Sequence, residues 1–178
     1  MNTRAGRDRA AAQAYRVQLP LIDRLIDDNP GAQQDPPVSA AEALALLRHS
    51  VRRDIEALLN ARRRWRSWPS FYEELAVSPV GYGISDFAAG AFNDPAQRDR
   101  LCLQIADTIR RFEPRLAQVR VLQVDTGNPL EATLRLRIEG LLRTEPAPEP
   151  IAFDTLVEAA TAEVQVKIPP GNRPAPDV

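Results

Sequence analysis

The spacing of hydrophobic residues predicts a long amphipathic helix in the first half of the chain. Between residues 39 and 60 the apolar positions recur three or four residues apart, which places them on one face. They are Leu44, Leu47, Val51, Ile55 and Leu58. Ser39 precedes the pattern and Glu42 follows Ser39 by three residues, the arrangement of a capping box. The helix is therefore expected to begin after Ser39 and to end near Asn60, with its charged residues largely outside the apolar face.

A second helix is predicted after Asp94-Pro95, because aspartate caps helices and proline suits the first helical position. Its apolar stripe consists of Leu101, Ile105, Ile109 and Phe112. Pro114 disfavours a helical conformation at Glu113, so the helix should end there. Residues 78–92 contain three glycines with aromatic residues between them and are expected to be irregular. The apolar cluster at residues 20–26 is expected to pack on the domain as a helical turn.

Beyond the second helix the hydrophobic period changes from 3.6 to 2, which is typical of strands. Residues 118–124, 134–138, 151–157 and 164–168 alternate in this way, and the proline-rich residues 146–150 are expected to form a loop. Helices followed by hairpins predict an α+β fold with two main helices packed on a small antiparallel sheet. We expect one domain over residues 20–168, a flexible N-terminal tail at 1–19 and a disordered C-terminal tail at 169–178.

Composition narrows the possible function. The formal net charge is −1, so the overall charge does not favour nucleic acid binding. The chain holds one cysteine, Cys102, and one histidine, His49. Cys102 lies in an apolar pattern and is interpreted as a core residue. The N-terminal residues lack the apolar stretch of a signal peptide, and no segment approaches a membrane span. These observations favour a cytoplasmic protein without metal, cofactor or membrane insertion.

Catalytic motifs are absent from the sequence. No glycine-rich loop has the context of a phosphate or dinucleotide site. A Ser/His/Asp triad would depend on His49, which has no motif around it. Glu113 is the best-placed acid for a peptidoglycan-cleaving glycosidase, but Arg110, Arg111 and Arg115 lie close to it in sequence. Neighbouring cations favour an ionised carboxylate, whereas the general acid of a glycosidase must keep its proton. No catalytic residue is therefore assigned.

Two charged segments are candidate partner-binding sites. The first contains Arg62, Arg63 and Trp65; arginine and tryptophan are favoured at protein interfaces, although such a basic run can also be a solvated turn or contact nucleic acid. The second is Glu113-Pro114-Arg115 at the junction between the second helix and the first strand. It is either a local ion pair that closes the helix or a rigid charged knob for a partner of complementary charge.

Four segments in order resemble the TssE family, the baseplate subunits of type VI secretion systems related to the sheath-initiating wedge proteins of contractile-tailed phages. Residues 20–25 resemble the family's Leu-Leu-Asp-Arg-Leu segment, and residues 50–63 resemble its first-helix signature, with Ala61 where threonine is common. Residues 82–87 are similar to its Tyr-Gly-Leu-Pro-Asp-Phe loop, with Ser85 in place of proline. Glu113-Pro114-Arg115 matches its Glu-Pro-Arg motif.

The resemblance implies a structural, non-catalytic role in a cytoplasmic baseplate docked at the inner membrane, together with TssF, TssG and TssK. Glu113, Pro114 and Arg115 are expected to contact the helical core bundle of the TssF–TssG wedge. The sheet is expected to accept strands from the sheath proteins TssB and TssC and so to start sheath polymerisation. The sequence does not determine which edge of the sheet is receptive; of the hairpins, the one formed by residues 151–158 and 163–168 is favoured. A glycosidase, or a regulatory adaptor of the same fold, is the alternative.

Overall fold

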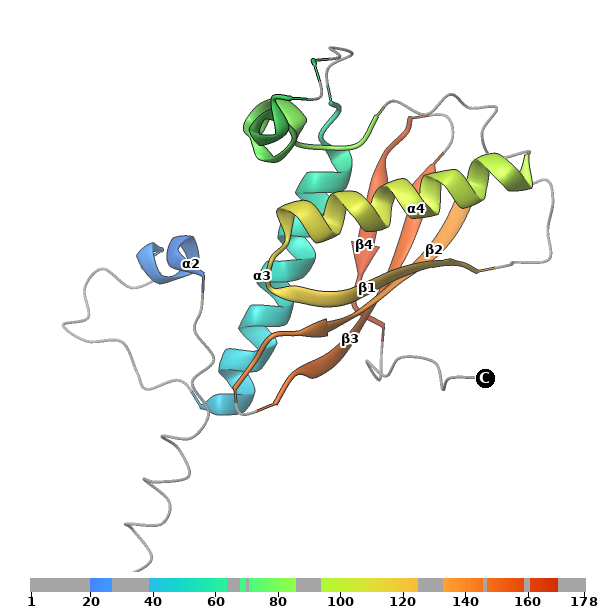
Figure 1. Cartoon of the computed structure of the whole chain (residues 1–178). Coiled ribbons are helices and arrows are strands. Elements are labelled where there is room, and N and C mark those ends of the chain that lie inside the picture. Colours follow the sequence, from blue (N-terminus) through green and yellow to red (C-terminus); the bar gives the residue numbers. More distant parts are fainter. Residues whose placement is uncertain are drawn as a thin grey trace, which may run out of the picture.

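The computed structural model describes residues 20–26, 39–63, 68–69, 71–85, 94–124, 133–145, 147–158 and 161–169. The helical elements are α2 (Leu21–Leu25), α3 (Ala40–Asn60), the short 3-10 turns η1 (Glu73–Val77) and η2 (Pro79–Gly81), and α4 (Pro95–Phe112). The strands are β1 (Leu116–Gln123), β2 (Thr133–Leu142), β3 (Glu149–Glu158) and β4 (Val164–Lys167). Figure 1 shows two main helices packed with one sheet, which confirms the α+β prediction.

Local capping sets the ends of the two long helices. Glu42 N–H donates to Ser39 Oγ at 3.2 Å and Ser39 N–H donates to Glu42 Oε2 at 2.9 Å, so the predicted capping box is present. Asp94 Oδ1 accepts from Ala96 N–H at 3.0 Å, with Pro95 in the first turn of α4. α3 ends at Asn60 and α4 at Phe112, as predicted.

The sheet is an antiparallel meander in the order β1-β2-β3-β4. Several predicted boundaries are wrong: β2 continues to Leu142, well beyond residue 138, and β1 and β3 start earlier than predicted. β1 begins at Leu116 and not at residue 118, because Arg143 N–H already donates to Arg115 O at the start of the β1–β2 pair. β3 begins at Glu149, so Pro150 lies in the strand and not in the loop. β4 is short and opposes β3 only at Asp154–Val157, so the missing N–H of Pro150 leaves no gap in that ladder.

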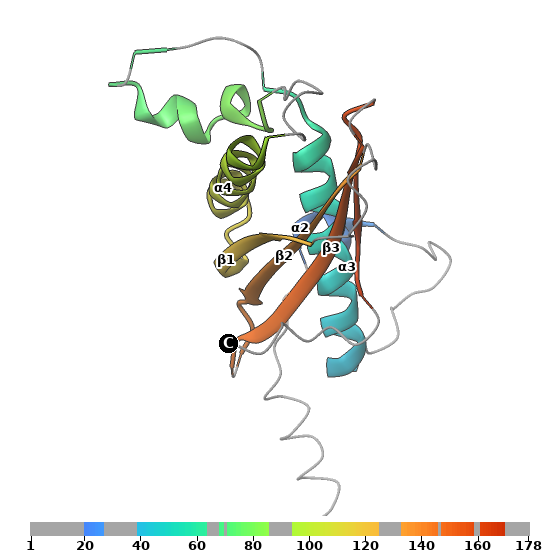
Figure 2. The same ribbon diagram turned by 90° about the vertical axis from the view of Figure 1, so that its right-hand side faces the viewer.

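Both long helices pack on one face of the sheet and enclose a single core (Figure 2). The predicted inward positions of the strands are buried there; they are Leu134, Leu136, Ile138, Ile151, Phe153, Thr155, Val157, Val164 and Val166. From α3 and α4 the core takes Val51, Ile55, Ile105 and Ile109, all close to fully buried, and Cys102 also lies in it. The opposite face of the sheet exposes polar side chains such as those of Arg135, Asp154 and Lys167.

The β4 edge is covered by α3. Side chains of Arg52, Glu56 and Asn60 bond the outward N–H and C=O groups of Val164 and Val166. The β3–β4 hairpin therefore does not present a free edge at β4, contrary to the prediction. The charged residues of α3 lie outside its apolar face, as predicted, and some of them bond the backbone of a strand about a hundred residues away, a contact that the periodicity does not predict.

A short backbone bridge anchors the segment after α3. Arg63 N–H donates to Ile84 O at 2.9 Å and Ile84 N–H donates to Ala61 O at 3.1 Å, and the Ile84 side chain is fully buried. Gly83 makes this approach possible: its φ is +99°, and a Cβ there would lie 2.3 Å from Ala61 O. Glycine in this predicted irregular segment thus has a definite packing role.

Several predictions fall on residues outside the described ranges. They include Trp65, residues 86–92 of the irregular segment and the tails at 1–19 and 170–178. The division into one domain and two tails stays a prediction. Of the helices in the described ranges, none combines the length and the hydrophobicity that a bilayer-spanning segment needs.

Candidate functional site

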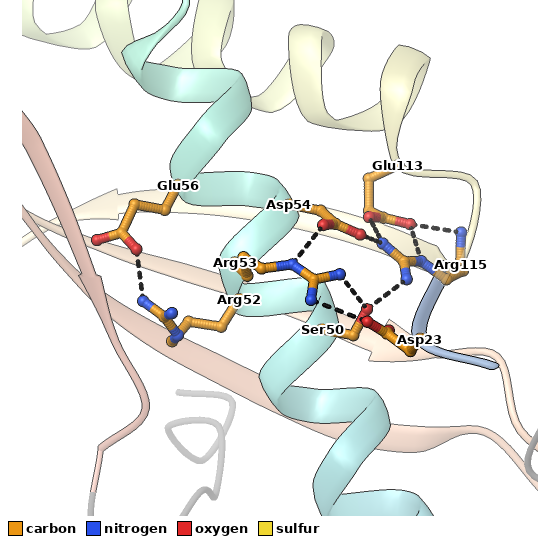
Figure 3. A network of polar contacts seen from close by, with 8 residues as sticks. All are labelled: Asp23, Ser50, Arg52, Arg53, Asp54, Glu56, Glu113 and Arg115. Atoms are coloured by element: carbon orange, nitrogen blue, oxygen red, sulfur yellow. Dashed lines mark hydrogen bonds and ion pairs between the residues drawn. The ribbon is translucent and has the colours of Figure 1, made fainter. Parts of the chain in front are cut away.

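The junction between α4 and β1 is built around an inward-facing ion pair. The Glu113 side chain is buried, with the residue 3% exposed, and its carboxylate folds back on Arg115 (Figure 3). Arg115 Nε donates to Glu113 Oε1 at 2.6 Å, Arg115 Nη2 donates to Oε2, and the Arg115 backbone N–H donates to Oε1 at 3.2 Å. These bonds cross Pro114, which is exposed at the tip of the junction. The local ion pair, one of the two possibilities that the sequence left open, is therefore present. The charge of Glu113 is buried and not exposed to solvent.

Arg115 also fastens the junction to the middle of α3. Its Nη2 donates to Asp54 Oδ2 at 2.6 Å and its Nη1 donates to Ser50 Oγ at 3.2 Å. Burial alone would lower the pKa of Arg115, but hydrogen bonds and charges from Glu113 and Asp54 outweigh burial and raise it. The guanidinium thus stays charged and holds α3, α4 and β1 in one arrangement.

The polar network continues from α3 to α2. Arg53 Nε donates to Asp54 Oδ1 at 3.2 Å, and Arg53 Nη1 donates to Asp23 Oδ1 at 2.8 Å. Partial desolvation by itself would raise the pKa of Asp23, yet the hydrogen bond from Arg53 and the nearby cations lower it. A chain of opposite charges therefore links α2, α3 and the α4–β1 junction, three parts of the sequence that carried separate motifs.

Sequence reasoning did not find these partners. Ser50, Arg53 and Asp54 lie within the helical segment that resembles a known signature, but periodicity alone assigns them no contact. The sequence did contain one signal for these contacts, the adjacent opposite charges of Arg53 and Asp54. Two such side chains can form ion pairs with two neighbouring elements at once. Which elements these would be depends on the tertiary packing.

The short helix α2 presents its apolar side chains outward. Leu21, Ile22, Leu25 and Ile26 are 59% to 73% exposed. The apolar cluster was predicted to pack on the domain, and the structure instead attaches α2 through the Asp23–Arg53 ion pair. A row of exposed aliphatic side chains held in place by a polar anchor is typical of a surface that a partner covers.

A groove of about 570 Å³ runs between α2 and the α4–β1 junction. Leu21 and Ile22 of α2 line it together with Tyr82 and Phe112, whose rings lie edge to face at 5.3 Å. Charged residues of the network and Pro114 complete the lining. Burial, followed by the charges of Asp54 and Glu113, raises the pKa of Tyr82, so its hydroxyl remains neutral in this setting. The lining of the groove thus combines apolar side chains with the charged residues of the network.

The residues considered for catalysis do not have the surroundings that a catalytic acid or nucleophile requires. Both carboxylate oxygens of Glu113 accept hydrogen bonds from Arg115, which leaves no group there arranged to protonate a substrate. Burial raises the pKa of the Cys102 thiol, the opposite of what a nucleophile requires. His49 is exposed on α3. Within the described residues no group of three or more His, Cys, Asp or Glu side chains is placed to hold a metal ion.

The arginines after α3 bind neighbouring parts of the chain. Arg62 Nη1 donates to Leu59 O at 2.9 Å and its Nη2 donates to Ala162 O, while Arg63 Nη2 donates to Ser85 Oγ at 3.0 Å. They tie the end of α3 to the turn before β4 and to the segment after Gly83. A role for Arg62, Arg63 and Trp65 at an interface stays a prediction.

A known protein family matches the part of the chain that contains the α4–β1 junction. Residues 45–147 match the family model described as baseplate wedge protein gp25. This span is more than half of the 178 residues and contains Asp54, the groove aromatics Tyr82 and Phe112, and the whole α4–β1 junction. α2, β3 and β4 lie outside it. No curated protein matches the chain.

Proposed function

Because the chain belongs to the family of the baseplate wedge protein gp25, we propose that it is a structural, non-catalytic subunit of the baseplate of a contractile injection system. More specifically, we propose a TssE-type subunit of a type VI secretion system, acting in the cytoplasm at the inner membrane with TssK, TssF and TssG. The four ordered sequence resemblances support this narrower assignment. The buried ion pair of Glu113 supports a structural role for the motif.

The groove between α2 and the α4–β1 junction is the proposed docking surface for the TssF–TssG wedge. The observation that carries the proposal is that three aliphatic side chains of α2, and Ile26 directly after it, are more than half exposed beside an apolar groove. An amphipathic helix of a partner would bury them, as in other helix-in-groove contacts. Glu113, Pro114 and Arg115 all line the groove, Pro114 as an exposed residue and Glu113 as a buried one. The Glu-Pro-Arg motif thus acts mainly by fixing the surface and only partly by touching the partner.

The sheet is the proposed starting point of the sheath formed by TssB and TssC. Antiparallel sheets with an uncovered edge accept strands through main-chain hydrogen bonds, and alternation of side chains sets the register. A rigid unit that binds the wedge on one side and offers a strand edge on another would fix where the first sheath subunits attach. Such a role needs precise placement of elements and no chemical step.

A co-purification experiment with TssF and TssG tests the docking surface. Charge reversal at Glu113 is a poor probe, because this buried residue is part of the fold. Leu21→Asp and Ile22→Asp change side chains that are 70% and 64% exposed, so folding should be preserved. Burying a leucine or isoleucine contributes about 1.5–3 kcal/mol, so each variant should bind about tenfold or more weakly.

The matched control is Leu103→Asp on α4, where the leucine is 65% exposed but does not line the groove. It should bind like the wild type. Equal co-purification of all three variants would remove the groove from the proposal. A turbidity assay on purified cell walls addresses the glycosidase alternative: we expect no clearing, and clearing that disappears in Glu113→Gln would contradict the structural role.

A further inference from the structure

The two 3-10 turns η1 and η2 carry an exposed aromatic and aliphatic surface. Its large side chains, which are 49% to 73% exposed, are Phe71, Tyr72, Val77 and Val80. No residue of η1 is buried. Figures 1 and 2 show this segment in green, projecting from the C-terminal end of α3 outside the sheet and the two long helices. We call residues 71–82 the aromatic protrusion. Its exposed side chains do not contribute to the core, and such a group is typical of a surface that another molecule covers.

Local bonds hold the aromatic protrusion in one shape. Ser78 joins the two turns, because its Oγ donates to Leu75 O at 2.9 Å and accepts from Val80 N–H at 3.2 Å. Gly81 N–H donates to Ser78 O at 2.9 Å. A Cβ on Gly81 would lie 2.4 Å from Ala76 O, so η2 packs directly on η1. A surface that is already ordered loses little conformational entropy when a partner binds it.

The aromatic protrusion is fixed to the domain at its C-terminal end. The ring of Tyr82 lies edge to face against that of Phe112 on α4, and the backbone bridge of Ile84 with Ala61 and Arg63 follows two residues later. Tyr82 also lines the groove beside α2. The exposed apolar surface of the protrusion therefore begins where the proposed docking groove ends, and a partner held in the groove lies within reach of it.

The charge of the protrusion indicates what kind of partner fits it. Residues 67–85 contain two acidic residues, Glu73 and Glu74, and no lysine, arginine or histidine. Both glutamates are exposed and directly follow the rings of Phe71 and Tyr72. Arginine suits this combination, because its guanidinium pairs with carboxylates and stacks on aromatic rings. An acidic partner would be repelled by the same glutamates.

We infer that the aromatic protrusion is a second docking surface, and that it binds a basic segment of the TssF–TssG wedge in which arginines lie among apolar residues. The arginines pair with Glu73 and Glu74 and stack on Phe71, while the apolar side chains of the segment cover Val77 and Val80. The identity of the partner rests on the proposed function. The chemistry of the segment rests on the residues of the protrusion alone, so the two are tested separately.

Co-purification of the full chain with TssF and TssG tests the partner. Phe71→Ser removes a ring that is 73% exposed, and Glu73→Lys reverses an exposed charge, so both variants should fold. Capture should weaken about tenfold for Phe71→Ser and about fivefold for Glu73→Lys. The matched controls are Leu103→Ser, at a leucine that is 65% exposed, and Asp99→Lys, at an exposed aspartate. They make the same kinds of change on α4 and should bind like the wild type.

An NMR titration of the full chain tests the chemistry of the segment. The probes are a synthetic peptide of alternating arginine and leucine, and its counterpart with glutamate in place of arginine. The arginine peptide should shift the amide signals of residues 71–81, and it should bind the Phe71→Ser variant about tenfold more weakly. The glutamate peptide should leave these signals unchanged. Equal shifts with both peptides, or no shift at residues 71–81, would overturn the inference.

The outcomes separate the inference from the proposed function. If the wild type, Phe71→Ser and Glu73→Lys all capture TssF–TssG equally well, the inference is wrong and the proposed function stands. If the wild type captures neither protein, both are wrong. Loss confined to the two protrusion variants supports both.

Two other occupants of the protrusion would also overturn the inference. Residues 1–19 of the chain contain four arginines and one aspartate. If the signals of residues 71–81 move when residues 1–19 are deleted, the chain's own basic segment binds the protrusion. If they move as the protein concentration rises, a second copy of the chain binds it. The inference requires that both changes leave these signals in place.

Discussion

Removing either member of the Glu113–Arg115 pair should destabilise the fold, and the two removals should differ in size. Arg115→Met keeps most of the aliphatic stem but leaves the Glu113 carboxylate, whose side chain is 4% exposed, without its cation. Glu113→Gln leaves a guanidinium that is 25% exposed and still bonded to Asp54. The group left behind is more deeply buried in the first case, so Arg115→Met should be the more harmful change.

The magnitudes follow from the number and burial of the broken bonds. Breaking a buried ion pair by removing one partner costs about 3–5 kcal/mol, which we assign to Arg115→Met. Loss of hydrogen bonds to a charged group that keeps other partners costs about 1.5–3 kcal/mol, which we assign to Glu113→Gln. With a urea dependence of about 2 kcal/mol per molar, the unfolding midpoints should fall by about 2 M and about 1 M.

Urea titration followed by circular dichroism measures both changes on the same protein preparation. A double variant, Glu113→Leu with Arg115→Met, removes both charges and should be more stable than Arg115→Met alone, because no unpaired carboxylate remains. Equal midpoints for the two single variants, or a double variant weaker than either, would refute the account of an inward-facing pair. Shifts near zero would mean that the network contributes little to the fold.

Three further predictions concern other contacts. Gly83→Ala should lower the free energy of unfolding by about 2 kcal/mol or more, measured by thermal melting, because its Cβ would meet Ala61 O at positive φ; an unchanged melting temperature would contradict the close approach. Asn60→Ala should cost about 2 kcal/mol and speed exchange of the Val164 amide, since both outward groups of Val164 lose their partner. The pKa of Asp23 is lowered, so its pairing with Arg53 should stabilise α2 above about pH 4 and weaken as pH falls through the folded-state value. Carboxyl-carbon NMR follows this titration, and Asp23→Asn should abolish the pH dependence of the α2 signals.

Most of the fold could be predicted because its signals are local. The capping box at Ser39 and Glu42, proline after Asp94, and the change of period near residue 118 each act within a few residues. The start of β3 was missed because proline is usually excluded from strands, and only the shortness of β4 makes Pro150 acceptable. The length of β4 is a property of the neighbouring strand and cannot be predicted from residues 149–158 alone.

The site was only partly predictable. The sequence identified Glu113-Pro114-Arg115 but left open whether the charges point inward or outward. The answer depends on Ser50 and Asp54, which lie more than sixty residues away and meet Arg115 only after α3 packs on the sheet. Likewise, the sequence placed the charged residues of α3 outside its apolar face but gave them no partner, since periodicity separates apolar from polar positions and does not say what a polar side chain bonds.

The contact between α3 and β4 has a consequence for which mutations the protein tolerates. Arg52, Glu56 and Asn60 bond peptide groups, which are the same for every residue type except proline. The exposed side chains at Gln165 and Lys167 take no part in these bonds, so a saturation library should accept nearly any residue there. Proline at 164 or 166 should be eliminated, because it would remove an N–H that α3 requires. A strand that is bound through its peptide groups therefore tolerates substitution of its exposed side chains.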